Sequence, residues 1–161
     1  MMLEHVELVI ATAEDAGKLL ELQKEAFKKY SDKYGDFDSN PYHMSEKRIL
    51  FSINYRYGKY YKIINNENGE LIGGIFGFLV DEQDSVVKIA QFYLKEEYRS
   101  LGLGKEVLQG IFKEFPMIKK WYVDTILEEE YNVRFYQQLG FEIIDYEIEH
   151  EGLTFVTLLK K

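Results

Sequence analysis

The chain has 161 residues, 46% hydrophobic and 30% charged, and its 20 Lys and Arg against 28 Asp and Glu give a net charge of −8. It contains no Cys, which excludes a disulfide scaffold, a Cys-ligated metal and thiol catalysis, and the negative charge disfavours nucleic-acid binding. The longest apolar stretch is too short to span a membrane, and the first residues carry no basic secretory signal. We therefore expect one cytoplasmic domain over residues 1–161 with no nucleic-acid or membrane partner.

The predicted elements alternate between strand and helix along the chain. Residues 4–11 alternate in polarity and indicate a first strand. Thr12 and Asp15 have the spacing of a capping box before a helix that ends near Tyr30, and Ser45 can cap a second helix. Further strands are predicted at 60–64, 71–80, 86–94, 121–126, 141–149 and 153–159, and further helices at 103–115 and 132–139. The order β-α-α-β-β-β-α-β-α-β-β predicts an α/β (α+β) fold.

A glycine-containing turn at residues 99–105, between a strand and a helix, is the sharpest local signal. Amides at a helix start attract anions, and Gly102 and Gly104 let a phosphate approach the backbone. The turn matches neither the Walker motif nor the dinucleotide fingerprint, because Arg99 and Val107 replace glycines that those motifs require. An ordinary strand-to-helix turn with two convenient glycines explains the same residues, so the turn alone leaves both interpretations open.

Two motifs resemble the GCN5-related N-acetyltransferase (GNAT) family. Residues 91–104, Gln-Phe-Tyr-Leu-Lys-Glu-Glu-Tyr-Arg-Ser-Leu-Gly-Leu-Gly, are similar to its acetyl-CoA motif. Its Phe-Tyr-x-x-x-Gly-Phe segment stands here at residues 135–141. The element order extends the resemblance over nearly the whole chain. The resemblance implies a mixed, mostly antiparallel sheet of six to seven strands, splayed at strands 4 and 5 and flanked by about four helices.

The resemblance implies acetyl-CoA as co-substrate. The backbone of the fourth strand would pair with the pantetheine arm, the amide of Leu94 would polarise the thioester carbonyl, and the glycine turn would hold the pyrophosphate. Relatives often carry an Asn at the position of Glu129, whereas here Asn132 lies close by. The implied cofactor-binding residues are Phe92, Tyr93, Leu94, Arg99, Ser100, Leu101, Gly102, Leu103, Gly104, Lys105 and Asn132.

The implied reaction is direct attack of a neutral amine on the thioester. Tyr136 matches the family's proton donor to the CoA thiolate, and packing as a core aromatic is the alternative. Asp124 aligns with one position that serves as the base in some relatives, and a solvated strand-end carboxylate is its alternative. Gln91 stands where other relatives carry Glu, and an amide cannot act as a base. The three histidines lie in unrelated elements without metal-ligand spacing, so no metal site is expected.

The expected acceptor is a primary amine of a small cationic molecule or of a peptide. Asp36 and Asp38 lie in the loop between the first two helices, where the family usually frames its acceptor, and would attract a protonated amine. Gln91 and Glu129 favour an alternative, a non-catalytic acyl-CoA-binding or regulatory module on the same fold. A plain interaction domain with a purely structural glycine turn is a third hypothesis, and a homodimer stays open.

Overall fold

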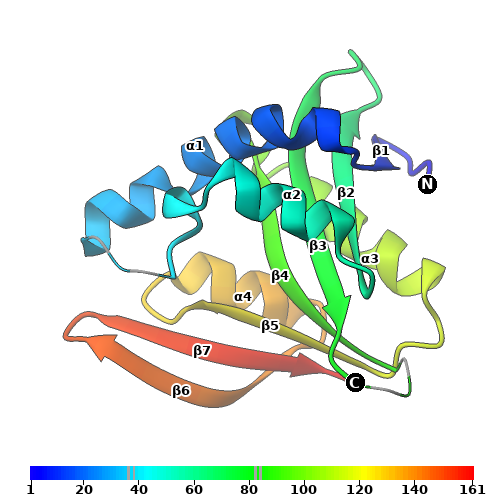
Figure 1. Ribbon diagram of the computed structural model, residues 1–161. Coiled ribbons are helices and arrows are strands. Elements are labelled where there is room, and N and C mark those ends of the chain that lie inside the picture. Colours follow the sequence, from blue (N-terminus) through cyan, green and yellow to red (C-terminus); the bar gives the residue numbers. More distant parts are fainter. Residues whose placement is uncertain (36, 38, 82, 84) are drawn as a thin grey trace.

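A computed structural model describes residues 1–35, 37, 39–81, 83 and 85–161. Within these residues seven strands form one sheet in the order β1-β2-β3-β4-β5-β7-β6 (Figure 1). Neighbouring strands are antiparallel except β4 and β5, which are parallel. The strands are β1 (Val6–Ile10), β2 (Gly58–Asn65), β3 (Leu71–Leu79), β4 (Val86–Leu94), β5 (Lys120–Ile126), β6 (Glu142–His150) and β7 (Leu153–Lys160).

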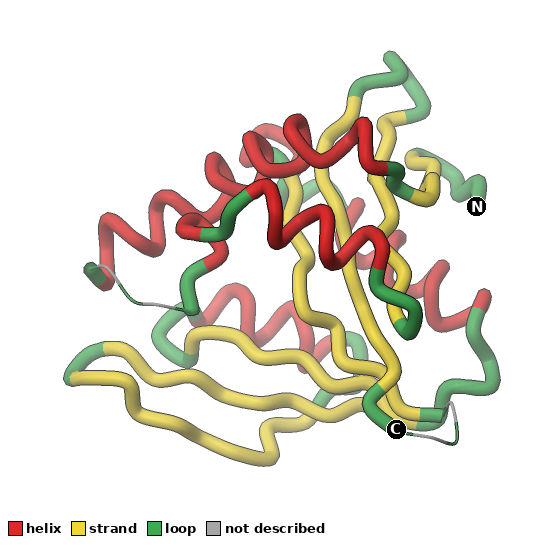
Figure 2. The backbone as a smooth tube through the Cα atoms, viewed as in Figure 1, coloured by secondary structure: helices red, strands yellow, loops and turns green. Residues whose placement is uncertain are grey.

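Helices cover both faces of this sheet (Figure 2). They are α1 (Ala16–Tyr34), α2 (Glu46–Asn54), α3 (Leu103–Glu114) and α4 (Glu130–Gln138), and three short 3-10 turns at Ala13–Asp15, Pro41–His43 and Glu96–Tyr98 join the described elements. No helix in the described part of the chain is long and apolar enough to cross a membrane.

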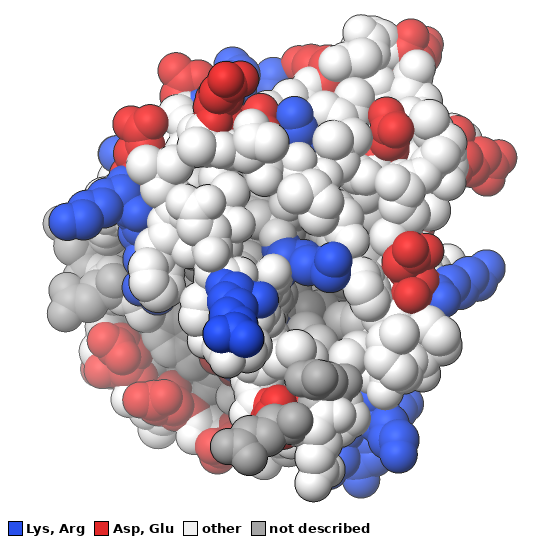
Figure 3. Space-filling model, turned by 45° about the vertical axis from the view of Figure 1, so that its right-hand side comes forward, with Lys and Arg blue, Asp and Glu red and all other residues white. Residues whose placement is uncertain are grey.

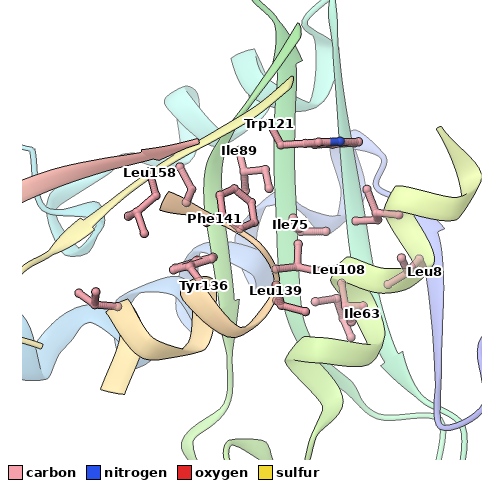
Figure 4. Packing of buried hydrophobic residues seen from close by; sticks show 14 of the residues in the cluster. Leu8, Ile63, Ile75, Ile89, Leu108, Trp121, Tyr136, Leu139, Phe141 and Leu158 are labelled. Carbon is pink, nitrogen blue, oxygen red and sulfur yellow. The ribbon is translucent and has the colours of Figure 1, made fainter. Parts of the chain in front are cut away.

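Neighbouring residues of β3 belong to different cores, because side chains alternate between the faces of a strand. Phe76 packs with Leu19 of α1 on one face. On the other face Ile75 packs with Leu108 of α3 and Tyr136 of α4 (Figure 4). The sheet is therefore buried on both sides at β3, whereas β6 is exposed along most of its length.

The strands β4 and β5 pair over only part of their length. Their register runs from Val86 opposite Lys120 to Ile89 opposite Val123. Beyond Ile89, β4 continues along β3 while β5 continues along β7, and the two strands diverge (Figure 1). The predicted fold class, with its mixed sheet splayed at strands 4 and 5, is confirmed.

The predicted caps are present in the structure. The Thr12 amide donates to the Asp15 carboxylate at 2.7 Å, and Ser45 Oγ accepts the Arg48 amide at 3.2 Å. Both signals act within one helical turn, which is why the local sequence predicts them.

Two predicted helix ends were wrong. The first helix continues past Tyr30 to Tyr34, and the last helix begins at Glu130 rather than residue 132. Glu129 explains both differences, because its carboxylate accepts hydrogen bonds from Lys33 Nζ, at 2.7 Å, and from the Tyr34 hydroxyl. This contact joins the end of α1 to the start of α4 across 95 residues, which a local pattern cannot reveal.

Candidate active site

A cavity of about 670 Å³ occupies the space between the diverging halves of β4 and β5. The helices α1 and α4, the start of α3 and the β6–β7 hairpin complete its wall. Its charged lining is divided by sign. The basic residues belong to the glycine turn, and they are Arg99 and Lys105. The carboxylates belong to β5 and β6, and they are Asp124, Asp145, Glu147 and Glu149, which we call the acidic wall.

The edge of β4 that faces away from β3 presents backbone groups to this cavity. The Lys95 amide donates to the Ile72 carbonyl at 2.8 Å and therefore faces β3. Because peptide groups alternate between the two edges of a strand, the amides of Phe92 and Leu94 face the opposite edge. Pairing with β5 has already ended at Ile89. An extended chain can therefore pair with β4 there as an added strand.

The two glycines of the turn at the start of α3 have different surroundings. Gly102 adopts a left-handed conformation with φ of 81°, and a Cβ on it would meet nothing within 4 Å. A Cβ on Gly104 would lie 3.1 Å from the ring of Phe135, so Gly104 is also needed for close packing of α3 against α4. The first helical bond joins the Glu106 amide to the Gly102 carbonyl, which leaves the amides before Glu106 without helical acceptors.

Of the predicted cofactor-binding residues, most line the cavity. Leu101 and Leu103 do not line it. The Leu101 side chain is 64% exposed, and that of Leu103 packs against the core beneath α3. These two residues can therefore contribute only their backbone amides to a ligand.

Tyr136 is both a core residue and a cavity residue. Its ring lies 5.1 Å from that of Phe135 and 5.5 Å from that of Phe141, measured between centroids. It also lines the cavity, and its hydroxyl has no hydrogen bond to any residue described in the structure. Burial raises the pKa of Tyr136 well above its usual value, Tyr30 adds to the rise, and Arg99 opposes it. A tyrosine hydroxyl is protonated at neutral pH even at its ordinary pKa, so Tyr136 has a proton to donate, and the rise makes it a weaker acid.

Asn132 connects α1 with the glycine turn. Its Nδ2 donates to the Tyr30 hydroxyl at 2.9 Å, and its Oδ1 accepts from Arg99 Nη2 at 3.0 Å. Arg99 is thereby oriented at the edge of the cavity. Tyr30, which also lines the cavity, is a residue that the sequence marks only as part of an apolar helix face.

The candidate base Asp124 is already engaged. Its Oδ1 accepts the Thr157 hydroxyl at 2.7 Å, and its Oδ2 lies 2.5 Å from Lys88 Nζ. In contrast, Gln91 lines the cavity with a buried Oε1 that has no hydrogen-bond partner within the described structure. A buried acceptor without a donor is costly in a folded protein, so this atom is available to a ligand N–H. Asp36 and Asp38 lie outside the described residues.

One histidine lies in a cluster that its sequence position does not reveal. Nitrogen and oxygen atoms of His5, Glu4 and Glu106 that could bind a metal all lie within 4.8 Å of one another, although Glu106 is 101 residues from His5 in the sequence. The His5 ring nitrogen Nδ1 lies 2.7 Å from Glu106 Oε1, and the Glu106 carboxylate also accepts the backbone amides of His5 and Val6. These hydrogen bonds account for the cluster.

The model of the Acetyltransferase (GNAT) family matches residues 18–141. The chain belongs to this family. It is 27% identical over 120 residues to the uncharacterized protein YrkN of Bacillus subtilis, and the match covers 74% of this chain and 63% of YrkN. The GNAT chain thus spans less than two thirds of that relative's length.

Solved structures share the fold of this GNAT chain at low sequence identity. An acetyltransferase of Thermus thermophilus has a TM-score of 0.75 and 14% identity over 99% of both chains. The PaiA N-acetyltransferase of Thermoplasma acidophilum, in complex with coenzyme A, has a TM-score of 0.74 and 20% identity, and the match covers 98% of this chain and 99% of that one. A chimera of the spermidine N-acetyltransferase SpeG from Vibrio cholerae and hSSAT has a TM-score of 0.76 and 14% identity. This match covers 98% of this chain and 95% of the chimera.

Proposed function

We propose that this GNAT chain is an N-acetyltransferase that moves the acetyl group of acetyl-CoA to a primary amine of a small cationic molecule or of a peptide. One observation carries the proposal. A single cavity joins the basic glycine turn, the open edge of β4 and the acidic wall. An anionic cosubstrate and a cationic acceptor can therefore enter from opposite ends and meet beside Tyr136.

The glycine turn and β4 would bind the cosubstrate. The amides at the start of α3, with Arg99 and Lys105, supply donors and positive charge for a pyrophosphate. The open edge of β4 would pair with the pantetheine arm. In that pose the Leu94 amide donates to the thioester oxygen and stabilises the negative charge that develops there. The PaiA relative, which is solved with coenzyme A, supports this assignment at the level of the fold.

The acceptor would be held by groups opposite the glycine turn. The acidic wall attracts a protonated amine, and the unpaired Oε1 of Gln91 accepts an N–H and orients the nitrogen. Because Asp124 is paired with Lys88 and Thr157, we assign it to this wall, and the proton of the ammonium leaves to water. The neutral amine nitrogen then attacks the thioester carbon as the carbon–sulfur bond breaks. The nitrogen releases its extra proton to solvent, from which Tyr136 regains the proton that it gives to the thiolate.

Tyr136 would complete the reaction by donating its proton to the leaving thiolate. Its hydroxyl is protonated at neutral pH, and it makes no hydrogen bond to a described residue. Tyr136→Phe should lower kcat about 10²-fold while the Kd for acetyl-CoA changes little. Loss of the hydroxyl should also leave thermal stability close to that of the wild type, because no hydrogen bond is removed.

Release of the CoA thiol over a panel of polyamines, amino acids, aminoglycosides and peptides tests the function directly. Turnover of a cationic amine by the wild type that is lost in the Tyr136→Phe variant would support the proposed acetyltransferase activity. Tyr122→Phe is the matched control, because Tyr122 does not line the cavity and its hydroxyl, like that of Tyr136, has no hydrogen bond to a described residue. Tight CoA binding with no thiol release on any amine would instead favour the non-catalytic acyl-CoA module, for which the engaged Asp124 and the amide of Gln91 are the specific observations.

A further inference from the structure

A second cavity, of about 290 Å³, lies beneath the C-terminal end of α3 and beside the first residues of β4. Its wall combines residues from β2, β3, β4, α3 and β5 with the segments before β2 and after α3. It is strongly apolar, and its main side chains are Ile75, Ile89, Ile111, Phe115, Ile118 and Trp121. At this size it approaches the lower end of the range of small-molecule pockets, about 300 Å³.

The opening of this cavity is basic. Arg56 and Lys59 belong to its lining and are both exposed, so they stand where the cavity meets solvent. The Lys59 ammonium lies 5.9 Å from the ring centroid of Phe115, and the Arg56 guanidinium lies 5.4 Å from that of Tyr57. None of the described lining residues is acidic. On the face seen in Figure 3, basic side chains border a hollow in a largely uncharged surface.

This charge pattern is opposite to that of the chain as a whole. The net charge of −8 makes a site with two cations and no described carboxylate a local exception. Glu114 is close enough to Tyr61 in the wall to add to the rise in the pKa of that tyrosine, which burial mainly causes. Glu114 is therefore a negative charge near one lining residue, although Glu114 is not itself part of the lining.

We propose that this second cavity binds a small amphipathic carboxylate, an aliphatic or aromatic acid. Its apolar body would enter between Ile75, Ile111 and Trp121, which removes its surface from water. Its carboxylate would remain at the opening, where Arg56 offers paired N–H donors and Lys59 a second positive charge. The site is separate from the glycine turn and does not depend on acetyl transfer.

Three ligands with the same apolar body and different heads test the proposal on the full chain. Calorimetric titration with octanoate, octan-1-ol and octanamide, in saturating CoA, measures binding while the cosubstrate part of the first cavity is occupied. Octanoate should bind at least tenfold more tightly than the other two and raise the unfolding temperature. Equal affinity for the three ligands, or tighter binding of either neutral ligand, would overturn the proposal.

Variants locate the binding on the chain. Lys59→Met and Arg56→Met should each weaken octanoate binding severalfold, and Val87→Phe should abolish it by filling the cavity. Lys113→Met, an exposed charge on α3 outside the lining, is the matched control and should bind like the wild type. Arg56 and Lys59 at the opening are exposed, so their replacement leaves the core intact even where Val87→Phe disturbs folding. Octanoate binding of wild-type strength in both the Lys59→Met and the Arg56→Met variant would contradict the assignment.

Discussion

Gly102 provides a test of the phosphate assignment in which backbone strain can be subtracted. Its φ of 81° and the empty space around its Cβ position are shared by Gly69, with φ of 71°, in the turn between β2 and β3. Alanine at either position should cost about 1 kcal/mol of unfolding free energy through the same strain. Of the two glycines only Gly102 lines the cavity, where an added methyl group would push a pyrophosphate away from the amides. Gly102→Ala should therefore weaken CoA binding roughly tenfold.

Titration of CoA into both variants, with denaturant unfolding as the stability measurement, gives the comparison. The expected result is equal destabilisation and unequal affinity. If the alanines at positions 102 and 69 have the same CoA affinity as the wild type, the glycine turn is a structural turn only. Gly104→Val is less informative, because its side chain would also meet Phe135.

Gln91 should show opposite effects on stability and on catalysis. Its buried Oε1 lacks a donor, so Gln91→Met should raise the unfolding free energy by about 1 kcal/mol. The same change removes the acceptor proposed for the amine N–H and should raise the KM for the amine roughly tenfold, with little change in the KM for acetyl-CoA. Gln109→Met, on the exposed side of α3, provides the baseline for this substitution. A variant that is less stable, or whose amine KM is unchanged, would show that Gln91 has a different role.

At the scale of elements, Glu106 ties the start of β1 to the first turn of α3. The hydrogen bond to Glu106 raises the pKa of His5, burial opposes it, and the charge of Glu4 contributes further. A raised folded-state pKa means that the folded chain binds the proton more tightly than the unfolded chain. The stabilisation is complete below the ordinary pKa of about 6.5 and is lost as the pH rises through the raised value.

The unfolding temperature should therefore fall between pH 6 and pH 8 through this contact. The His5→Gln variant should not show this part of the decrease, which amounts to no more than a few degrees. At pH values above the raised pKa its unfolding temperature should match that of the wild type. Differential scanning calorimetry across this range, with His150→Gln as control, measures the effect. A His5→Gln profile parallel to that of the wild type throughout would exclude the contact as its source.

The sequence predicts elements well where their signals are local. Caps at Thr12 and Ser45, and the glycine turn, depend on residues within a few positions of each other, and each is present in the structure. The splay of β4 and β5 followed from the family resemblance rather than from periodicity. The helix ends near Tyr30 and Glu129 were missed because they depend on contacts between α1 and α4.

The site was predictable to the same extent. Motif residues such as Leu94, Gly102 and Tyr136 could be identified from spacing and resemblance. The partners that decide how a residue can act, such as Lys88 beside Asp124, come from other strands. The acidic wall was missed because the pairing of β6 with β7, and of β7 with β5, places its carboxylates beside Asp124. No pattern within β6 indicates that placement.

At the scale of the molecule, the net charge of −8 is distributed unevenly about the first cavity. Positive groups gather at the glycine turn, and the acidic wall lies across the divergence of β4 and β5. Within this wall, Glu147 lies opposite Phe155 on β7, and Asp145 lies opposite Thr157. No ion pair with a described residue is formed by either carboxylate, in contrast to Asp124, so their charge acts on whatever enters the cavity.

This distribution predicts how the rate responds to salt. Screening weakens attraction between exposed charges, so the KM for a cationic amine should rise as ionic strength increases from about 0.01 M to about 0.3 M. Glu147→Gln should raise KM at low salt severalfold and flatten the salt dependence, with kcat little changed. Glu142→Gln, on the same strand but outside the cavity lining, is the matched control and should keep the wild-type response. A preferred acceptor that is anionic, or a KM indifferent to salt in all three proteins, would contradict electrostatic recognition of the acceptor by this wall.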